Sequence, residues 1–338
     1  MESFKEEVDF VNPIKPNDKY DKYDKFQKNE SNISLNSYIS YDNPEDIDES
    51  KLTGIFGNIV KKMYPNVESS RITILIQSMA IFSSMLPYGK GFYYYDGSYK
   101  TFLNEFIVLV GNSFSGKGNS FNNIRALFKH VDPNFLDKNI TRNIQSGESL
   151  VYRLRDEEPD PNDPYAVEKD KRLLLYQSEF SDLLTVSGRE FNTLSSHIRN
   201  AFDGEDLENN TKGSLIKASK PYLSIIGHIT PSELLNKFSN QVNFFNGFGN
   251  RFLWFYIEGS KPLARGGNHK FPDTYQKEID DLNFAIKKVS RNENDSELII
   301  NSEFYEKYDD WYQKKWNSKS SGVLDSLSQR DPKHIWKL

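Results

Sequence analysis

The residues best suited to chemistry form a short stretch of glycine, serine and lysine that follows an apolar run. Gly111 is followed by four residues, then by Gly116 and Lys117, in the order GNSFSGK. Backbone N–H groups in a loop of this kind can surround a phosphate group, and the lysine adds a positive charge. We therefore expect this stretch to bind the phosphates of a nucleotide, with an ordinary glycine turn as the alternative.

The predicted phosphate site consists of ten consecutive residues. They are Gly111, Asn112, Ser113, Phe114, Ser115, Gly116, Lys117, Gly118, Asn119 and Ser120. A Ser or Thr usually follows the lysine and gives a hydroxyl to Mg²⁺, but this chain has Gly118 at that position. Ser120 is the candidate for the missing oxygen, with Asn119 as the alternative.

Apolar patterns place this loop between a strand and a helix. Residues 107–110 form a run typical of a buried strand, and residues 121–130 carry apolar side chains at helical spacing. Three more apolar runs follow, at residues 172–176, 222–227 and 252–257. Strands separated by helices predict an α/β protein with a parallel sheet covered on both faces. Ligands of such sheets bind at the carboxyl ends of the strands.

Polar residues next to these strands could complete a site for nucleotide hydrolysis. Such a site needs a carboxylate that orients water and groups that stabilise the charge of the transition state. Glu179 follows the second run and is the candidate for the water-polarising carboxylate and for a Mg²⁺ ligand, together with Ser120. The residue before it is Ser178, where an aspartate is usual. The alternative role for Glu179 is that of a helix N-cap.

Two further strand ends carry candidates, each with a structural alternative. His228 and Thr230 follow the third run and could place a polar group beside the γ-phosphate, or could form a satisfied turn. Arg251 precedes the fourth run and could reach the nucleotide of a neighbouring subunit, or could form a structural ion pair. The site residues thus come from four separate segments.

Composition divides the chain into four predicted regions. Residues 1–50 hold 13 acidic residues against 6 lysines and are interpreted as a disordered or loosely attached leader, with a recruitment motif as the alternative. Residues 51–100 are expected to form a helical region, with helices at 51–64 and 69–86 and a hairpin at 92–97. Residues 101–260 are expected to form the nucleotide-binding core, and residues 261–338 a C-terminal helical region.

Several classes of protein are disfavoured by composition. The chain has no cysteine, so it has neither disulfides nor thiolate metal sites, and its five histidines are scattered. No apolar run reaches the ~18 residues that a membrane-spanning helix needs. No signal peptide is visible at the acidic N-terminus. We expect a cytoplasmic protein that does not enter a membrane.

Six blocks of the sequence resemble, in order and spacing, a family of helicase-like P-loop ATPases from phages, plasmids and chromosomal cassettes. These proteins are often encoded with primase-polymerase domains. The blocks are VGNSFSGKGNS, SGESLVYRLRD, LLLYQSEFSDLL, TLSSHIRNAFDGE, LSIIGHITPSEL and NGFGNRFLW. The resemblance runs from about residue 50 to the C-terminus, and Gly118 is similar to a trait of the family. NRFLWFYI also resembles the arginine-finger strand of AAA+ helicases of the minichromosome-maintenance type, and SQRDPKHIWKL the start of their lid helix.

The resemblance implies an AAA+/RecA-like P-loop NTPase fold with a C-terminal helical lid that is only partly present, because the chain stops at Leu338. It also implies ATP and Mg²⁺ as ligands, Arg251 acting in trans on a neighbouring nucleotide, and Arg330 contacting the γ-phosphate in cis. His228 and Thr230 fall at its polar sensor position.

By the same resemblance, the expected activity is that of an ATP-hydrolysing helicase-like motor in the replication of a mobile genetic element. The expected partners are single-stranded DNA, identical subunits in a ring that is expected to be hexameric, and a primase. Lys212 and Lys217 are the candidates for DNA contacts. The alternative function is an ATP-gated assembly module or a DNA-binding adaptor with little or no hydrolysis.

Overall fold

A five-stranded sheet positions the candidate site. Its strands are β3 (Phe106–Val110), β4 (Ile140–Thr141), β5 (Arg172–Gln177), β8 (Tyr222–Ile229) and β9 (Leu253–Tyr256), in the spatial order β4-β5-β8-β3-β9. All neighbouring strands are parallel. The computed structural model describes residues 46–86, 92–96, 98–157, 169–211, 214–240, 247–257, 262–264, 267, 271–290, 296–298 and 302–317.

The sheet confirms the predicted α/β class with a parallel sheet between helices. Every residue of β3 and β8 is buried, as continuous apolar runs in parallel strands predict. The four predicted strands lie within a residue or two of their expected positions. β4 was missed because it has only two residues, too few for a recognisable pattern.

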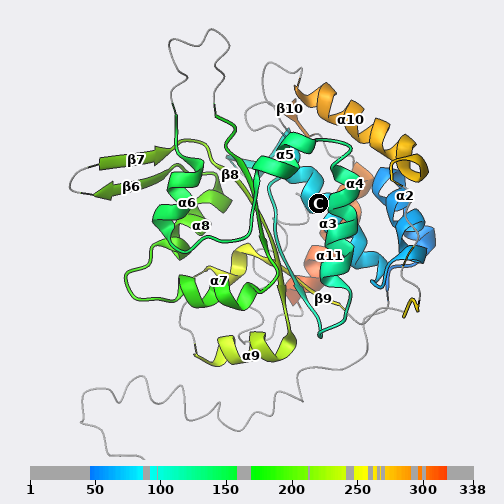
Figure 1. Cartoon of the computed structure of the whole chain (residues 1–338), viewed down its shortest axis with the longest axis horizontal. Coiled ribbons are helices and arrows are strands. Elements are labelled where there is room, and N and C mark those ends of the chain that lie inside the picture. Colours follow the sequence, from blue (N-terminus) through cyan, green and yellow to red (C-terminus); the bar gives the residue numbers. More distant parts are fainter. Residues whose placement is uncertain are drawn as a thin grey trace, which may run out of the picture. The chain divides into compact units, whose positions relative to one another are not determined.

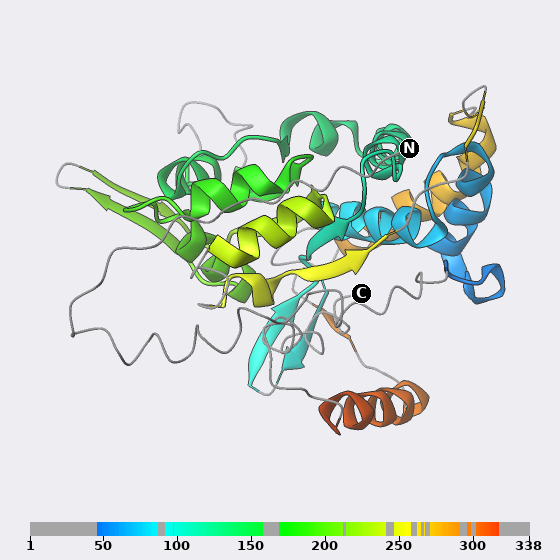
Figure 2. The same cartoon turned by 90° about the horizontal axis from the view of Figure 1, so that it is seen from below.

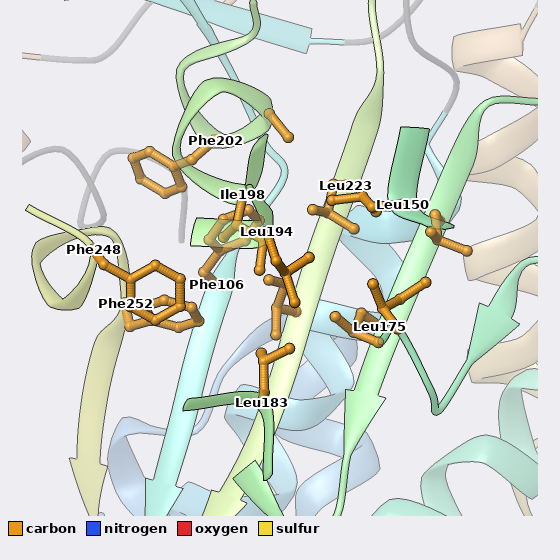
Figure 3. Close-up of a cluster of buried hydrophobic side chains, with 14 of the residues drawn as sticks. Phe106, Leu150, Leu175, Leu183, Leu194, Ile198, Phe202, Leu223, Phe248 and Phe252 are labelled. Carbon is orange, nitrogen blue, oxygen red and sulfur yellow. The ribbon is translucent and has the colours of Figure 1, made fainter. Parts of the chain in front are cut away.

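One face of the sheet carries α6 (Gly147–Leu154), α7 (Phe180–Ser187) and α8 (Leu194–Asp203) (Figure 1). Their apolar side chains form one buried cluster with alternate residues of the strands, among them Phe106 and Leu175. Figure 3 shows this cluster, with Phe248 and Phe252 beside Phe106. The alternation follows from strand geometry, in which successive side chains point to opposite faces.

The other face carries α2 (Gly54–Met63), α3 (Arg71–Met85), α4 (Lys117–Phe128), α5 (Pro133–Lys138) and α10 (Gln276–Ser290) (Figures 1 and 2). These helices form a second buried cluster with Ile107, Leu174 and Ile226 of the sheet. Residues of the predicted N-terminal helical region therefore share a hydrophobic core with the strands that follow them. The expected helices at 51–64 and 69–86 correspond to α2 and α3.

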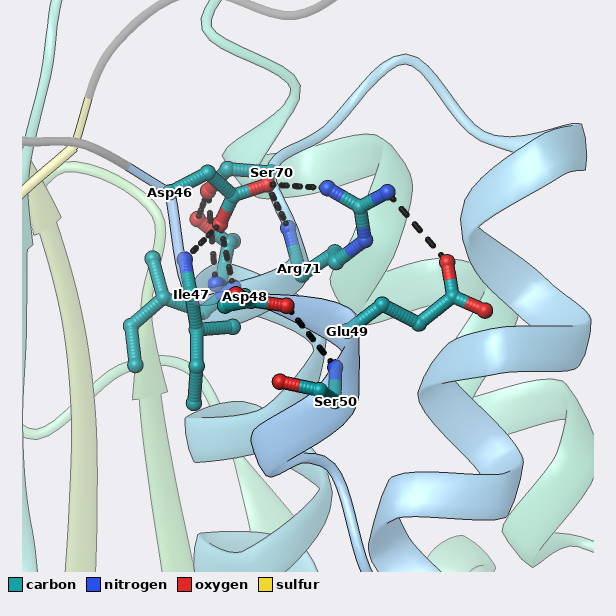
Figure 4. Close-up of polar contacts among 9 residues, drawn as sticks. Asp46, Ile47, Asp48, Glu49, Ser50, Ser70 and Arg71 are labelled. Atoms are coloured by element: carbon teal, nitrogen blue, oxygen red, sulfur yellow. Dashed lines mark hydrogen bonds and ion pairs between the residues drawn. The ribbon is translucent and has the colours of Figure 1, made fainter.

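The start of α3 is fixed by residues at the end of the predicted leader (Figure 4). Asp46 accepts hydrogen bonds from the N–H groups of Arg71 (2.8 Å) and Ile72 (3.0 Å), and Ser70 caps the helix through Thr73 N–H. Carboxylates are favourable at helix N-termini, where N–H groups lack partners. Residues 46–50 thus belong with the helices, which corrects the predicted boundary at residue 50. Residues 1–45 lie outside the described residues.

The remaining elements lie outside the central sheet. The expected hairpin is present as β1 (Phe92–Asp96) and β2 (Tyr99–Phe102), and β10 (Ser296–Glu297) adds a third strand in parallel to β1. A second hairpin, β6 (Leu207–Thr211) with β7 (Ser214–Ala218), precedes β8. Two further α-helices are α9 (Pro231–Asn240) and α11 (Ser302–Asn317). Short 3₁₀ helices occupy Glu49–Lys51, Tyr64–Asn66, Gly249–Arg251 and Asp273–Tyr275. No helix in the described part of the chain is long and apolar enough to cross a membrane.

Candidate functional site

A cavity of about 490 Å³ lies at the carboxyl ends of β3, β5 and β8. Small-molecule sites in proteins typically have volumes of this order. Its lining comes from five segments: Glu68, residues 113–119, Tyr176 with Ser178 and Glu179, residues 228–230, and Glu233. The fold therefore brings residues 113–119 of the predicted loop, Glu179, His228 and Thr230 to one cavity, whereas Gly111, Asn112 and Ser120 are not in its lining. Glu68, Tyr176 and Glu233 were not predicted.

The glycine-rich loop is anchored at both ends by main-chain contacts. Gly111 N–H donates to Ile229 O (3.0 Å), which joins the start of the loop to the end of β8. Gly116 has a left-handed φ of +79° and is the N-cap of α4. A Cβ at Gly116 would lie 1.5 Å from the carbonyl oxygen of Glu68. Glycine at this position is thus required both by the backbone conformation and by the close approach of Glu68.

Lys117, the first residue of α4, has its ammonium group inside the loop. Its Nζ donates to Gly111 O (2.5 Å), Asn112 O (3.0 Å) and Ser115 Oγ (2.9 Å). No side chain caps the N-terminus of α4 among the described residues. The N–H groups of its first turn therefore remain available, and a helix N-terminus with a neighbouring lysine favours anionic ligands such as phosphate.

Phe114, in the middle of the loop, combines two unfavourable features. Its φ is +67°, a conformation that disfavours residues with a Cβ, and its side chain is 97% exposed. The left-handed backbone costs about 1 kcal/mol or more relative to glycine. Strained residues of this kind cluster at functional sites, which supports the interpretation of the loop as a site.

The charged side chains of the cavity wall are three carboxylates and one ammonium group. Partial burial lowers the pKa of Lys117, whereas the negative charges of Glu179 and then Glu233 oppose that change. Glu179 occupies the N-cap position of α7, as the alternative expected, but its carboxylate makes no capping hydrogen bond. Its carboxylate instead lies within electrostatic range of Lys117.

Thr230 and Glu233 form a capping box at the start of α9. Thr230 N–H (3.1 Å) and its hydroxyl (2.7 Å) donate to Glu233 Oε2, and Glu233 N–H donates back to Thr230 Oγ1 (3.3 Å). The side-chain hydrogen bond from Thr230 is the main cause that lowers the pKa of Glu233. Thr230 is thus in a satisfied turn, the alternative considered for it. The sequence TPSE, with Thr and Glu three residues apart, is the signal that could have identified Glu233.

His228 forms part of an aromatic group beneath the cavity. Tyr176 stacks on Phe121 with ring centroids 3.6 Å apart, and His228 contacts the Tyr176 ring edge-on at 5.2 Å. The Tyr176 hydroxyl lies 3.5 Å from His228 Nδ1, and burial raises the pKa of this phenol to about 12, so it stays protonated. His228 Nε2 is buried and has no hydrogen-bond partner among the described residues.

We expect His228 to make the fold sensitive to acid. Burial, and next the positive charge of Lys117, lower the pKa of His228 to about 3. In the unfolded chain the imidazole of His228 takes up a proton near pH 6.5, whereas in the folded chain it stays neutral until the pH approaches 3. The contribution of His228 to the free energy of unfolding is therefore complete above pH 6.5 and is lost as the pH falls toward 3. Between pH 6.5 and 5 the free energy of unfolding should decrease by about 2 kcal/mol because of this residue.

Urea unfolding at pH 7 and pH 5 tests this expectation. In His228→Asn, whose side chain at this position cannot titrate, the free energy of unfolding should decrease by about 2 kcal/mol less than in the wild-type chain between pH 7 and pH 5. His197, whose pKa is also lowered by burial, is present in both proteins and does not affect the difference. His130→Asn, at an exposed position, is the control. An equal loss in wild type and His228→Asn would contradict the role of His228.

Ser120, the predicted metal ligand, is not in the lining of the cavity. Its hydroxyl is fully buried, accepts from Gln77 Nε2 (2.8 Å) and donates to Lys117 O (2.9 Å). Asn119 does line the cavity, and its Oδ1 accepts from Asn123. A Cβ at Gly118 would meet no atom within 4 Å, so lack of space does not explain the glycine.

A metal ion would depend on few protein ligands here. No group of three or more His, Asp or Glu side chains that could hold a metal occurs among the described residues. Among the oxygen-bearing side chains of the cavity lining, the carboxylates of Glu179 and Glu233 act electrostatically on Lys117. Mg²⁺ is commonly held by one or two carboxylates together with phosphates, so this set fits Mg²⁺ that arrives with a nucleotide.

Arg251 lies at the edge formed by the amino ends of the strands, opposite the cavity, because it precedes the parallel strand β9. Its guanidinium donates to Asp203 Oδ2 (2.6 Å) and to Gly247 O (2.7 Å), and the ion pair is largely buried. The structural ion pair considered as the alternative is therefore present. From this edge Arg251 cannot contact the glycine-rich loop of its own chain.

The other predicted residues are not at the cavity. Lys217 lies on β7 and forms exposed ion pairs with Asp206 (3.0 Å) and Glu208 (3.4 Å). Arg330 and Lys212 lie outside the described residues, as does the whole of SQRDPKHIWKL, the segment that resembles the start of the lid helix.

Comparisons with known proteins leave the site to be interpreted from its geometry. The chain matches no protein-family model and no curated protein sequence.

Proposed function

We propose that the chain binds ATP in the cavity at the β3–α4 loop and hydrolyses it. The observation that carries the proposal is the convergence of Lys117, the first-turn N–H groups of α4 and two carboxylates on one cavity at the carboxyl edge of a parallel sheet. This edge is where open α/β sheets bind ligands. The glycine-rich loop receives the phosphates, and Lys117 exchanges its contacts with loop carbonyls for contacts with phosphate oxygens.

The other side chains of the cavity have separate roles in the proposed hydrolysis. The carboxylate of Glu179 does not cap α7 and is the candidate to orient the attacking water. Glu233, whose carboxylate is held by Thr230 and has a lowered pKa, would be available as an oxygen ligand for a metal that accompanies the nucleotide. Mg²⁺ would neutralise charge on the phosphates. Where the Tyr176 phenol donates to Nδ1, the proton of the neutral His228 is on Nε2.

Use of ATP for movement along single-stranded DNA, in a ring of identical subunits, with a primase as partner, is the activity that we propose from the resemblance of the sequence. In that assembly Arg251 would act on a neighbouring nucleotide after leaving Asp203, and Arg330 would contact the γ-phosphate in cis. The hairpin β6–β7, which carries Lys217, is the part of the chain that would contact DNA.

A second candidate function is an ATP-gated assembly module with little turnover. It is favoured by the absence of two usual oxygen ligands, because position 118 is glycine and position 178 is serine. The hydroxyl of Ser120, the candidate replacement, is buried against Gln77. Steady-state ATPase measurements with Mg²⁺, with and without single-stranded DNA, separate the two candidates. Stimulation by DNA supports the motor, and nucleotide binding without turnover supports the assembly module.

Glu179→Gln provides the sharper test of hydrolysis. The amide keeps the size of the side chain but loses the charge, so we expect turnover to fall by about 100- to 1,000-fold while the Kd for ATP changes by less than about threefold. Glu190→Gln, an exposed position beyond α7, is the matched control and should behave as wild type. Unchanged turnover in Glu179→Gln, with a loss in Glu233→Gln, would move the water-orienting role to Glu233.

A further inference from the structure

Gln77 is a polar residue in the middle of an otherwise largely apolar helix. It lies on α3, in the sequence RITILIQSMAIFSSM, and its side chain is fully buried where α3 lies against α4. Burying an amide costs free energy unless it is hydrogen-bonded. The cavity wall does not include Gln77, so a ligand contact does not account for its presence.

The hydrogen bonds of Gln77 lead to the first residue of α4. Its Nε2 donates to Ser120 Oγ (2.8 Å) and lies 3.5 Å from Lys117 O. Ser120 Oγ donates to the same carbonyl (2.9 Å). Lys117 thus has its carbonyl held from α3 while its ammonium organises the glycine-rich loop.

The segment just before α3 contacts the loop at the adjacent residue. The carbonyl of Glu68 lies against Gly116, and Ser69 Cα would be 3.0 Å from a Cβ at that position. Gly116 and Lys117, the two residues between the loop and α4, are therefore both in contact with one continuous stretch that ends in α3. This stretch restricts where the N–H groups of the first turn can point.

We propose that Gln77 is a positioning residue of the nucleotide site, acting through Ser120 on the first turn of α4. The inference rests on the proposed function, because it assigns Gln77 to the binding of the phosphate end of a nucleotide. It also explains why Ser120 does not serve as a metal ligand: its hydroxyl is part of the support of the loop. Neither residue touches the ligand itself.

The test measures ATP affinity and stability in the same variants. Gln77→Leu removes the amide and keeps most of the volume, and Ser120→Ala removes the hydroxyl that it contacts. Each should raise the Kd for ATP and for inorganic tripolyphosphate about tenfold at a temperature well below the melting temperature. The double variant should have about the same Kd as each single variant, because Gln77 and Ser120 act through the same series of hydrogen bonds.

The matched control is Ser84→Ala, on the same helix. Its buried hydroxyl donates to Ile81 O within α3 (2.6 Å), so its loss should lower the melting temperature without changing the Kd. A Kd in Gln77→Leu and Ser120→Ala within twofold of wild type would overturn the inference and leave a structural role only. Absence of binding by the wild-type chain would overturn the proposed function, and the inference with it.

Discussion

Lys117→Ala is expected to weaken ATP binding by at least about 100-fold and to reduce hydrolysis by about 1,000-fold. Lys117 is the only lysine or arginine in the described lining of the cavity. Its ammonium is already inside the loop, within 3.0 Å of three oxygen atoms, so little reorganisation is needed for it to contact phosphate. Removing a pre-positioned charge from a partly enclosed site affects the transition state more than the ground state.

Thermal unfolding with and without nucleotide gives a direct measurement. At an ATP concentration of 100 times the wild-type Kd, binding should stabilise the wild-type chain by about 2.7 kcal/mol and the variant by about 0.4 kcal/mol. Lys129→Ala is the matched control, because Lys129 caps the far end of α4 and its ion pair with Asp137 is exposed. An unchanged nucleotide-dependent shift in Lys117→Ala would show that the cavity is not the binding site.

Gly116→Ala is expected to abolish nucleotide binding and to destabilise the fold by about 3 kcal/mol or more. Two effects add at this residue. A left-handed φ disfavours alanine by about 1–2 kcal/mol, and the new Cβ would overlap the carbonyl of Glu68, which is main chain and cannot rotate away. The loop or the start of α3 must move, and either movement displaces the first-turn N–H groups of α4.

Gly118→Ala, two residues later, is the matched comparison. A Cβ there meets no atom within 4 Å, and a helical glycine is less favourable than alanine by about 0.5–1 kcal/mol. We expect this variant to be slightly more stable than wild type and to bind ATP normally. Chemical denaturation and ATP titration of the two variants measure the contrast. Equal behaviour of Gly116→Ala and Gly118→Ala would contradict the described loop conformation.

The central architecture could be predicted because its signals are local. Runs of apolar residues give β3, β5 and β8, since strands buried on both faces need no polar positions. A similar run gives β9, which is an edge strand and only partly buried. The hairpin β6–β7 was missed because LENNT is mostly polar and SLIKA is only five residues long. Its strands are fixed by pairing with each other, which sequence patterns do not record.

The candidate site could be predicted only where its residues adjoin a strand end. Glu179 and His228 follow predicted strands, so their approach to the loop follows from a parallel sheet. Glu68 precedes α3 and reaches the cavity through a close contact with Gly116 that no local pattern reveals. For Ser120 the local sequence suggested a contact that the structure does not show. Its position near Lys117 predicted a metal ligand, but its hydroxyl accepts a hydrogen bond from Gln77, 43 residues earlier in the sequence.

If the cavity binds a nucleotide as proposed, the balance of charge around it determines which form of the nucleotide enters. Glu68, Glu179 and Glu233 outnumber Lys117, and His228 stays uncharged near neutral pH. A bare triphosphate polyanion would meet net repulsion as it enters, whereas a chelated triphosphate with two charges neutralised would not. We therefore expect the metal-chelated triphosphate to bind more tightly than the bare triphosphate. The cause of this preference would be the carboxylates of the cavity wall, not the glycine-rich loop.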